Sequence, residues 1–359
     1  MKYAVRLSTW HRRVPLARPF VTAVRRTDSA SIVLVEAREA NGRSGLGEAA
    51  ISWRVTGASP AGVAAAVAGP LQDAVAAVDL DSPGSWWPQL RESLYGNDAA
   101  LSAVDTALWN LAAQQAGVGL GQLVAAHVAR RGAPLPPPVE PDAVATDITL
   151  SVAESVPALV AQVQTFAARG FHTVKLKVDA SSTSAAAVPA VARALPHVRL
   201  RVDANQCWQP AQALATLGEW RAAGVELEFV EQPVAAGDLT GLTQVRAHGP
   251  YPVVADESVR TAADLARLSE LGACDGVNVK LAKAGGLTPA LELALAARER
   301  DLTVLVGCML EAEVGVGAAR ALAAAVAPDR THDLDGPLWL TELSLASGLL
   351  PVPDAWEAL

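Results

Sequence analysis

Thr173-Val174-Lys175-Leu176-Lys177 decides the fold of this chain, because it is a short apolar and β-branched run that ends in charge. Such runs are typical of strands buried in a parallel sheet, where helices cover both faces. Gly276-Val277-Asn278-Val279-Lys280 has the same form. Three apolar runs between them close on a carboxylate, at Asp203, Glu231 and Asp256. Five successive predicted strands therefore end in ionisable side chains.

Lysine is scarce in this sequence. The chain contains five lysines, and four of them form two pairs, Lys175 with Lys177 and Lys280 with Lys283. Arginine carries nearly every other positive charge, but arginine stays protonated, whereas a lysine buried near other cations can lose its proton. Only lysine can therefore serve as a general base, and the two pairs indicate proton transfer.

The order of strand-like and helical runs predicts the domain organisation. Apolar runs begin near residues 147, 173, 198, 227, 252, 275, 302 and 331, and alanine-rich helical segments separate them. Eight such units predict an α/β fold, a (β/α)8-type barrel over residues 146–340. Residues 1–132 combine strand-like runs with an amphipathic helical pattern at 101–116, so we expect an α+β capping domain there. The proline-rich stretch at 133–145 cannot be a helix interior and is predicted to be the connector.

Composition restricts the classes of function. With 359 residues, 51% of them hydrophobic and 18% charged, the chain is expected to be globular. Its formal net charge of -8 and the absence of a clustered basic face argue against a nucleic-acid or anionic-membrane partner. The amino-terminal residues lack the apolar core of a signal peptide, and no apolar stretch is long enough to span a bilayer. We therefore expect a cytoplasmic enzyme that acts on a small molecule.

The strand ends of such a barrel meet at one mouth, which is where barrel enzymes carry their chemistry. In barrel order the predicted strands end in lysine, aspartate, glutamate, aspartate and lysine. Three crowded carboxylates repel one another unless a cation compensates them, and oxygen ligands in incomplete coordination favour Mg2+. Asp203, Glu231 and Asp256 are therefore the predicted metal ligands. The alternative for any one of them alone is a helix cap or an ion pair with an arginine.

The chain resembles the enolase superfamily, specifically its muconate lactonizing enzyme subgroup. The matching motifs are Lys175-Leu176-Lys177, Asp203-Ala204-Asn205, Glu231-Gln232-Pro233, Asp256-Glu257-Ser258 and Lys280-Leu281-Ala282-Lys283-Ala284-Gly285-Gly286. The resemblance implies a modified TIM barrel, Mg2+ as cofactor, and a capping domain that the carboxyl-terminal segment 341–359 rejoins. It also implies two opposing bases, Lys177 and Lys280, with Lys175 as a supporting charge. Lys283 falls beyond the strand end, so a loop or packing role is favoured for it.

The predicted eighth strand carries Asp333-Leu334-Asp335, whose alternation turns both carboxylates to one side. Two anions side by side can hold an ammonium group. The segment resembles the DxD motif of dipeptide epimerases, which binds the free amino group of the substrate. Helix capping or a loop ion pair is the alternative role for Asp333 and Asp335.

Three further segments resemble parts of the subgroup that surround the substrate. Residues 19–25 resemble the loop that closes over the substrate in Ala-Glu epimerases, where Arg25 would pair with a side-chain carboxylate. A solvated loop arginine is the alternative, since Arg26 stands next to it. Residues 50–58, the other closing segment, contain Trp53 and Arg54. Residues 307–311 resemble a GCMxE-type segment, which assigns Glu311 to substrate binding, while Glu313 would favour a cationic group if it faced the cavity.

These residues together predict a Mg2+-dependent dipeptide epimerase. Its reaction would be a two-base 1,1-proton transfer at the α-carbon of the C-terminal residue of a dipeptide, with L-Ala-D/L-Glu as one candidate. An N-acyl amino acid racemase or an o-succinylbenzoate synthase of the same subgroup is the nearest alternative. A non-catalytic binding protein with the same barrel is the remote one. Relatives commonly assemble from several subunits, so a homo-oligomer is expected.

Overall fold

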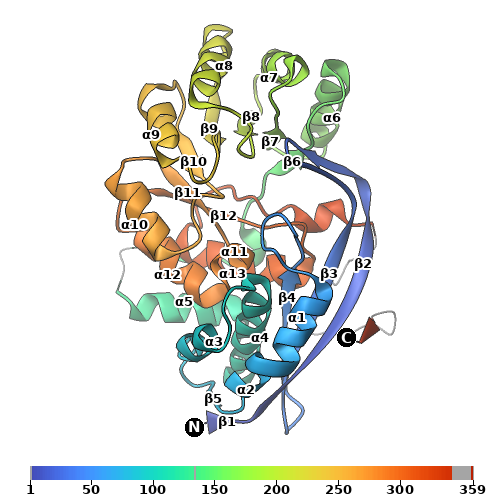
Figure 1. Cartoon of the computed structure of the whole chain (residues 1–359), viewed down its shortest axis with the longest axis vertical. Helices are drawn as coiled ribbons and strands as arrows, with labels where there is room; N and C mark the ends of the chain where they lie inside the picture. The colour runs from blue at the N-terminus through green and yellow to red at the C-terminus, as the bar shows by residue number, and fades with distance from the viewer. Residues whose placement is uncertain (1, 133–134, 342–356, 359) are drawn as a thin grey trace.

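The computed structural model describes residues 2–132, 135–341 and 357–358, and it consists of a capping domain and a barrel (Figure 1). In Figure 1 the barrel, coloured green to red, occupies the upper part, and the blue strands of the capping domain run along one side. A four-stranded antiparallel sheet, in the order β13-β2-β3-β4, forms one side of the capping domain, and a seven-stranded parallel sheet, β6 to β12 in sequence order, forms the barrel.

The strands of the capping domain are β1 (Lys2–Tyr3), β2 (Val5–Thr22), β3 (Arg25–Glu39), β4 (Ser44–Ala50), β5 (Val78–Asp79) and β13 (Glu357–Ala358). Its helices are α1 (Pro60–Ala66), η1 (Val67–Leu71), α2 (Gln72–Ala74), α3 (Trp87–Ser93), α4 (Asp98–Ala116) and α5 (Leu120–Arg130).

The barrel strands are β6 (Ile148–Leu150), β7 (Thr173–Lys177), β8 (Arg199–Asp203), β9 (Leu227–Glu231), β10 (Val253–Ala255), β11 (Gly276–Lys280) and β12 (Thr303–Gly307). Its helices are α6 (Val156–Ala168), α7 (Ser182–Ala194), α8 (Pro210–Ala222), α9 (Leu239–His248), α10 (Ala262–Glu270), α11 (Leu281–Ala284), α12 (Leu287–Arg298) and α13 (Glu313–Val326). Two 3-10 turns, η2 (Pro141–Ala143) and η3 (Gly336–Trp339), flank this domain.

The strand β3 contributes side chains to two hydrophobic cores, because successive side chains of a strand point to opposite faces of the sheet. Val33 and Val35 pack into the large core that includes the capping helices. Ile32 and Leu34 pack on the other face with Ala312 of the barrel domain. One strand therefore holds the capping helices on one side and the barrel on the other.

The helix α4 is buried on nearly all sides, so the amphipathic helix predicted at 101–116 is wrong in its burial. Residues 99–109 are all buried. The sheet covers one face so closely that a Cβ added at Gly47 would lie 1.9 Å from the carbonyl oxygen of Ala103. Contacts with α11 and α12 of the barrel cover α4 elsewhere. The sequence could not show this second covering layer.

The predicted barrel with a capping domain is confirmed, but its eighth strand is reduced to two bridging residues. His332 pairs with Thr146, and Asp333 pairs with Gly307, each as a parallel bridge. The Asp333 amide donates to the Val306 carbonyl at 3.0 Å, and the Asp147 amide donates to the His332 carbonyl at 2.8 Å. These bonds close the sheet between β12 and β6. The next residues turn into η3, which contains Pro337 near its start and cannot extend the ladder.

The predicted domain boundaries stay predictions. The predicted carboxyl-terminal segment lies largely outside the described residues, since 342–356 and 359 are not described. Within the described part, β13 pairs antiparallel with β2 of the capping sheet. No helix of the described ranges combines the length and the apolar character needed to cross a membrane.

Asp105 joins the capping domain to the barrel. Its carboxylate is fully buried in α4 and accepts hydrogen bonds from Trp86 Nε1 at 2.8 Å and from the Thr288 hydroxyl and amide at 2.7 and 2.8 Å. Burial raises the pKa of Asp105 to about 6. A Cβ added at Gly286 would lie 2.5 Å from Asp105 Oδ2, and this glycine has a φ of 147°. The second glycine of the 280–286 motif is therefore required by this junction.

We expect Asp105→Ala to lower the free energy of unfolding by about 2–4 kcal/mol, because it leaves three buried donors without an acceptor. Urea denaturation followed by circular dichroism measures the change. The matched control is Asp28→Ala. Asp28 is exposed, and its ion pair with Arg26, at 3.9 Å, is long and solvent-accessible. The free energy of unfolding of this variant should therefore stay near that of the native chain. Equal stability of the Asp105 and Asp28 variants would show that the junction contributes nothing.

Candidate active site

The ionisable strand ends meet at one end of the barrel. Lys175 and Lys177 lie at the end of β7, Asp203 ends β8, and Lys280 ends β11, while Asp256 follows β10 directly. In the parallel register Lys177 pairs with Asp203, and Asp203 pairs with Glu231. The sequence folds this way because each apolar run buries both of its faces and delivers only its last polar side chains to the barrel mouth.

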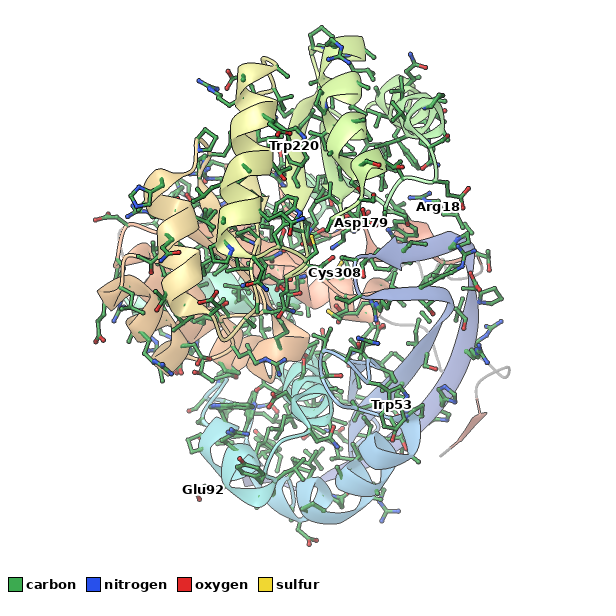
Figure 2. All side chains as sticks on the ribbon, turned by 45° about the horizontal axis from the view of Figure 1, so that its top comes forward. Arg18, Trp53, Glu92, Asp179, Trp220 and Cys308 are labelled. Atoms are coloured by element: carbon green, nitrogen blue, oxygen red, sulfur yellow. The ribbon has the colours of Figure 1, made fainter. Side chains whose placement is uncertain are left out.

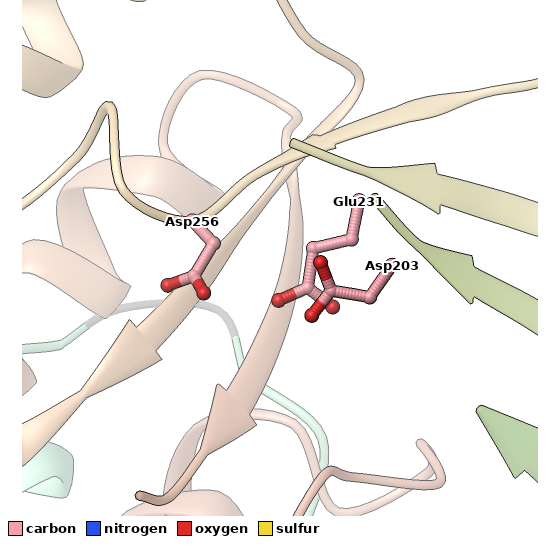
Figure 3. Close-up of side chains that lie close together, drawn as sticks. All are labelled: Asp203, Glu231 and Asp256. Carbon is pink, nitrogen blue, oxygen red and sulfur yellow. The ribbon is translucent and has the colours of Figure 1, made fainter. Parts of the chain in front are cut away.

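The three predicted metal ligands point toward one another. Asp203, Glu231 and Asp256 each offer a carboxylate oxygen, and these three atoms lie within 4.8 Å of one another (Figure 3). Asp203 and Glu231 are fully buried, and Asp256 is 3% exposed. Three buried anions at this spacing need cationic partners, because desolvation of a charge is costly unless another charge compensates it. The donor set is the one that Mg2+ prefers, hard oxygens with positions left open.

Lysine ammonium groups contact each of these carboxylates. Lys177 Nζ lies 2.5 Å from Asp203 Oδ2, and Lys280 Nζ lies 3.0 Å from Asp256 Oδ2. Lys175 Nζ lies 2.9 Å from Glu231 Oε2 and is fully enclosed. The predicted bases and the predicted ligands therefore form one interleaved cluster, not two separate groups.

Burial opposes the charge of every group in this cluster, and the neighbouring charges decide each outcome. Burial raises the pKa of Asp256, but Lys280 and Lys283 outweigh it and hold that pKa well below its usual value. Burial and the Asp203 carboxylate together raise the pKa of Glu231 above its usual value, against the opposing charge of Lys175. Burial lowers the pKa of Lys280, but the carboxylates around it, Asp256 first and then Glu231 and Asp333, together outweigh burial and raise that pKa. Glu231 is thus the carboxylate that most needs an additional cation.

Asp333 and Asp335 also face this end of the barrel, and neighbouring residues fix both carboxylates. Asp333 Oδ2 accepts from Lys175 Nζ at 2.6 Å. Asp335 Oδ2 accepts from the Thr149 amide at 2.7 Å and from Trp339 Nε1 at 3.1 Å. Asp335 precedes η3 but makes no capping bond to it, so capping does not explain the residue. Thr149 and Trp339 hold the pair at the wall of the cavity.

Charge and burial shift the pKa values of Asp333 and Asp335 in opposite directions. Burial raises the pKa of Asp333, but Lys175 and Lys280 outweigh it, so the pKa of Asp333 lies below its usual value. Burial and the charge of Asp333 raise the pKa of Asp335. A cation between them would favour the ionised form of both, which is what an ammonium group supplies.

One cavity joins the lysines, Asp256 and the aspartate pair to two segments of the capping domain. From the β2–β3 hairpin come Phe20 and Arg25, and from the loop after β4 comes Arg54. Arg25 Nη1 donates to Ser52 Oγ at 3.3 Å. Cys308, another lining residue, lies between the barrel helices and this hairpin (Figure 2). The complete lining is Phe20, Thr22, Val24, Arg25, Arg54, Val55, Thr149, Lys175, Lys177, Asn205, Asp256, Glu257, Lys280, Lys283, Cys308, Met309, Leu310, Asp333, Asp335 and Trp339.

The hairpin is fastened to the barrel next to this cavity. The Val21 amide donates to Ser151 Oγ at 3.0 Å, and the Val152 amide donates to the Val21 carbonyl at 3.0 Å. Arg18 lies where the hairpin meets the barrel (Figure 2), with its guanidinium 3.9 Å from the centre of the Trp339 ring. These contacts hold the hairpin over the barrel mouth.

Three residues that the sequence analysis singled out, Glu311, Glu313 and Trp53, are not part of the cavity lining. Glu311 is buried, and its Oε2 accepts from the Met309 amide at 2.7 Å, so it is not among the described residues that line the cavity. It lies beside Glu48, whose pKa burial and Glu311 raise to about 8. Glu313 lies 3.7 Å from Arg320 Nη1 and lines a different groove, and Trp53 is 74% exposed. Glu313 therefore gives no reason to expect a cationic substrate side chain.

Sequence reasoning missed several residues of the site. Asn205 and Glu257 lie inside the recognised motifs, and burial with the charges of Asp256 and Asp203 raises the pKa of Glu257 to about 7. Asn278 stands two residues before Lys280 on the same face of β11, which is a signal that could have found it. Thr149 carried no such signal, because it contacts Asp335 from a distant part of the chain. Trp339 carried none either, because its contact with Asp335, four residues away, depends on the turn of the chain into η3. Lys283, expected to be a bystander, is buried against Asp256.

Comparison with known proteins places this site in a family. Residues 4–125 match "Mandelate racemase / muconate lactonizing enzyme, N-terminal domain", and residues 158–355 match "Enolase C-terminal domain-like". The chain belongs to the enolase superfamily, in its mandelate racemase and muconate lactonizing enzyme group. The predicted resemblance is therefore confirmed.

Relatives of this superfamily member include epimerases with different substrates. The chain is 34% identical over 343 residues to the L-Ala-D/L-Glu epimerase of Clostridium acetobutylicum, covering 95% of this chain and 92% of that protein. It is 33% identical over 336 residues to the hydrophobic dipeptide epimerase of Citrifermentans bemidjiense, covering 91% and 87%. The structure of the dipeptide epimerase of Enterococcus faecalis V583, complexed with Mg and L-Leu-L-Tyr, superposes with a TM-score of 0.87 at 28% identity, covering 98% and 95%. The chain is accordingly an isomerase of the epimerase and racemase kind.

Proposed function

We propose that this enzyme is a Mg2+-dependent dipeptide epimerase that transfers a proton between the two faces of an α-carbon. The observation that carries the proposal is one cavity lined by Lys177, Lys280 and the aspartate pair, beside the carboxylate triad. The strands β7 and β11 lie opposite each other in the barrel, since β8, β9 and β10 separate them on one side and β12, the bridging residues and β6 on the other. A substrate carbon between them is open to both lysines.

Asp203, Glu231 and Asp256 are the residues that would hold Mg2+, in line with the structure of the Enterococcus relative, which contains Mg. The ion supplies positive charge that stabilises the enediolate form of the substrate carboxylate. Lys177 or Lys280 removes the α-proton, and the opposite lysine donates a proton to the other face. One proton leaves and one arrives, so the product differs from the substrate only in configuration.

Asp333 and Asp335 would bind the free amino group of the dipeptide. Their carboxylates are adjacent, and fixed donors from Thr149, Trp339 and Lys175 orient them. An ammonium held there places the α-carbon of the second residue between the two lysines. The acylated nitrogen of an N-acyl amino acid carries no positive charge, and o-succinylbenzoate, the product of the synthase, has no amino group, so the aspartate pair favours the dipeptide over the ligands of the alternative enzymes.

The second residue of the dipeptide is acidic in this proposal, with L-Ala-D/L-Glu as the candidate. Arg25 and Arg54 both line the cavity, and in the described residues neither forms an ion pair with a carboxylate. Burial, and then the charge of Arg54, lowers the pKa of Arg25. A substrate carboxylate would relieve this repulsion and can accept two parallel hydrogen bonds from a guanidinium.

Incubation with Mg2+ and a panel of L,L-dipeptides in deuterium oxide tests the function directly. Mass spectrometry follows deuterium at the α-carbon, and chiral chromatography follows the D-configured product. We expect exchange and inversion at the second residue, with acidic second residues preferred. Absence of exchange with every dipeptide in the panel would refute the epimerase.

We expect Arg25→Ala to lower kcat/KM for L-Ala-L-Glu by about 10- to 100-fold, since a hydrogen-bonded charge contributes about 1.5–3 kcal/mol. Turnover of L-Ala-L-Leu should not fall, because its side chain has no carboxylate. Arg26→Ala is the matched control, since Arg26 is exposed on the same hairpin. A similar loss with both dipeptides would mean that Arg25 supports the hairpin instead of reading the side chain.

A cytoplasmic location and a homo-oligomeric assembly stay predictions from the sequence.

A further inference from the structure

In each proposed metal ligand, the two carboxylate oxygens accept hydrogen bonds from two different kinds of donor. One oxygen of each accepts from a lysine already assigned to the reaction or its support: Asp203 Oδ2 from Lys177, Glu231 Oε2 from Lys175 and Asp256 Oδ2 from Lys280. The other oxygen accepts from a donor that the reaction does not use: Asp203 Oδ1 from the Asn205 amide at 2.9 Å, Glu231 Oε1 from Asn278 Nδ2 at 2.9 Å and Asp256 Oδ1 from Lys283 Nζ. We call these three donors the anchor donors.

Lys283 is the charged member of the three anchor donors. The residue is 2% exposed and lies in α11, a single turn that follows β11. Besides Asp256 Oδ1, its Nζ faces the main-chain oxygens of Asp256 at 2.5 Å, Asn278 at 3.3 Å and Val259 at 3.4 Å. An ammonium group has three protons to donate, so these four oxygens satisfy it fully.

This surrounding distinguishes Lys283 from the two proposed bases. Its ammonium is directed at the carbonyl oxygens of Asp256 and Val259, which follow β10, and of Asn278 within β11, so it cannot approach a substrate carbon without breaking those bonds. It also occupies Asp256 Oδ1, which leaves Oδ2 as the oxygen directed toward the rest of the cluster. The turn itself is closed by Gly285, whose φ of 100° few other residues adopt.

We propose that Lys283 is a positioning residue, which fixes the plane of the Asp256 carboxylate and thereby sets the affinity of the site for Mg2+. Asn278 performs the same role for Glu231. The proposal rests on the metal-binding part of the proposed function and not on which substrate is turned over. Partners that orient a ligand typically change metal affinity by about 10- to 100-fold when they are removed.

Calorimetric titration of the metal-free full chain with Mg2+, without substrate, tests this role. We expect Lys283→Met to weaken Mg2+ binding by about 10- to 100-fold, and Asn278→Leu to weaken it in the same direction. Lys283→Gln keeps a donor and serves as the milder variant if the methionine variant does not fold. High Mg2+ concentration should restore much of the exchange rate of these variants with the preferred dipeptide, because the bases and the aspartate pair are unchanged.

The control is Arg201→Met, which breaks another buried ion pair of the same barrel. Arg201 Nη1 lies 2.7 Å from Asp147 Oδ2, and neither residue touches the triad by any hydrogen bond of the described structure. This variant should lose thermal stability but keep native Mg2+ affinity. If the Lys283 variants and Asn278→Leu also lose only stability and bind Mg2+ as the native chain does, the positioning role is wrong. That outcome would not affect the proposal that the enzyme is an epimerase. Conversely, if the native chain exchanges no dipeptide, the epimerase proposal fails, but the Mg2+ titration still tests the positioning role.

Discussion

Replacing Lys177 or Lys280 by alanine is expected to abolish epimerisation while leaving one-sided proton exchange. Inversion needs removal of a proton on one face of the α-carbon and delivery on the other, so either lysine alone cannot complete it. Loss of a general base costs about 10²–10⁴-fold in rate. Chiral chromatography of the product measures inversion, and deuterium content by mass spectrometry measures exchange in the same samples.

Arginine at these positions separates basicity from charge. Lys177→Arg and Lys280→Arg keep the cation beside Asp203 and Asp256, but a guanidinium does not give up its proton at neutral pH. We therefore expect the arginine variants to be as inactive in inversion as the alanine variants. With the L,L-dipeptide as substrate, the variants of one lysine should still exchange the α-proton, because the remaining lysine faces that proton. The variants of the other lysine should not exchange it, because they have lost the base on that face. Full turnover in both alanine variants would rule out the two-base mechanism.

Removal of divalent metal is expected to abolish both exchange and inversion. Without a cation the enediolate would form beside the buried carboxylates of Asp203, Glu231 and Asp256, which repel it. Metal stabilisation of such a charge amounts to several kcal/mol, so the rate should fall by about 10³-fold or more. Treatment with EDTA, followed by dialysis and addition of Mg2+, should remove and then restore activity.

Glu231→Gln tests the requirement for bound metal without a chelator. The amide keeps the size of the side chain but loses the charge of the carboxylate that most needs the cation. We expect weak Mg2+ binding by calorimetry and loss of exchange with every dipeptide, at native secondary structure by circular dichroism. Native activity in EDTA, or in this variant, would show that the triad is not a catalytic metal site.

Much of the barrel could be predicted because each of its strands has a recognisable local sequence pattern. Runs such as 173–177 and 276–280 are apolar along their whole length, which is characteristic of strands covered on both faces. The polar last residues of parallel barrel strands share one mouth, so the sequence predicts that Asp203, Glu231 and Asp256 lie together. The same reasoning failed for the eighth strand, because pairing of His332 and Asp333 depends on the space left between β12 and β6.

Contacts between distant segments escaped prediction. The sequence of α4 has an apolar spacing, but only the fold places the barrel against the side that was expected to face water. Glu311 stands in a recognised motif, yet the loop before α13 turns its carboxylate toward its own backbone and Glu48. Lys283 lies beyond the end of its strand, and the single turn of α11 brings it back under Asp256.

The sequence pattern predicted the barrel strands, the carboxylate triad and the two lysine pairs, because alternation and burial along a parallel strand are local properties that fix where its last side chains point. The choice of Lys177 and Lys280 as the two bases came from the resemblance to the enolase superfamily. Only the packing of the whole chain shows that Asn278 and Lys283 hold two of those carboxylates, that Thr149 holds Asp335, and that Val21 of the hairpin is bonded to Ser151 of the barrel. These contacts join residues far apart in the chain. Their geometry follows from how the capping domain and the strand ends pack together, and no local pattern encodes that packing.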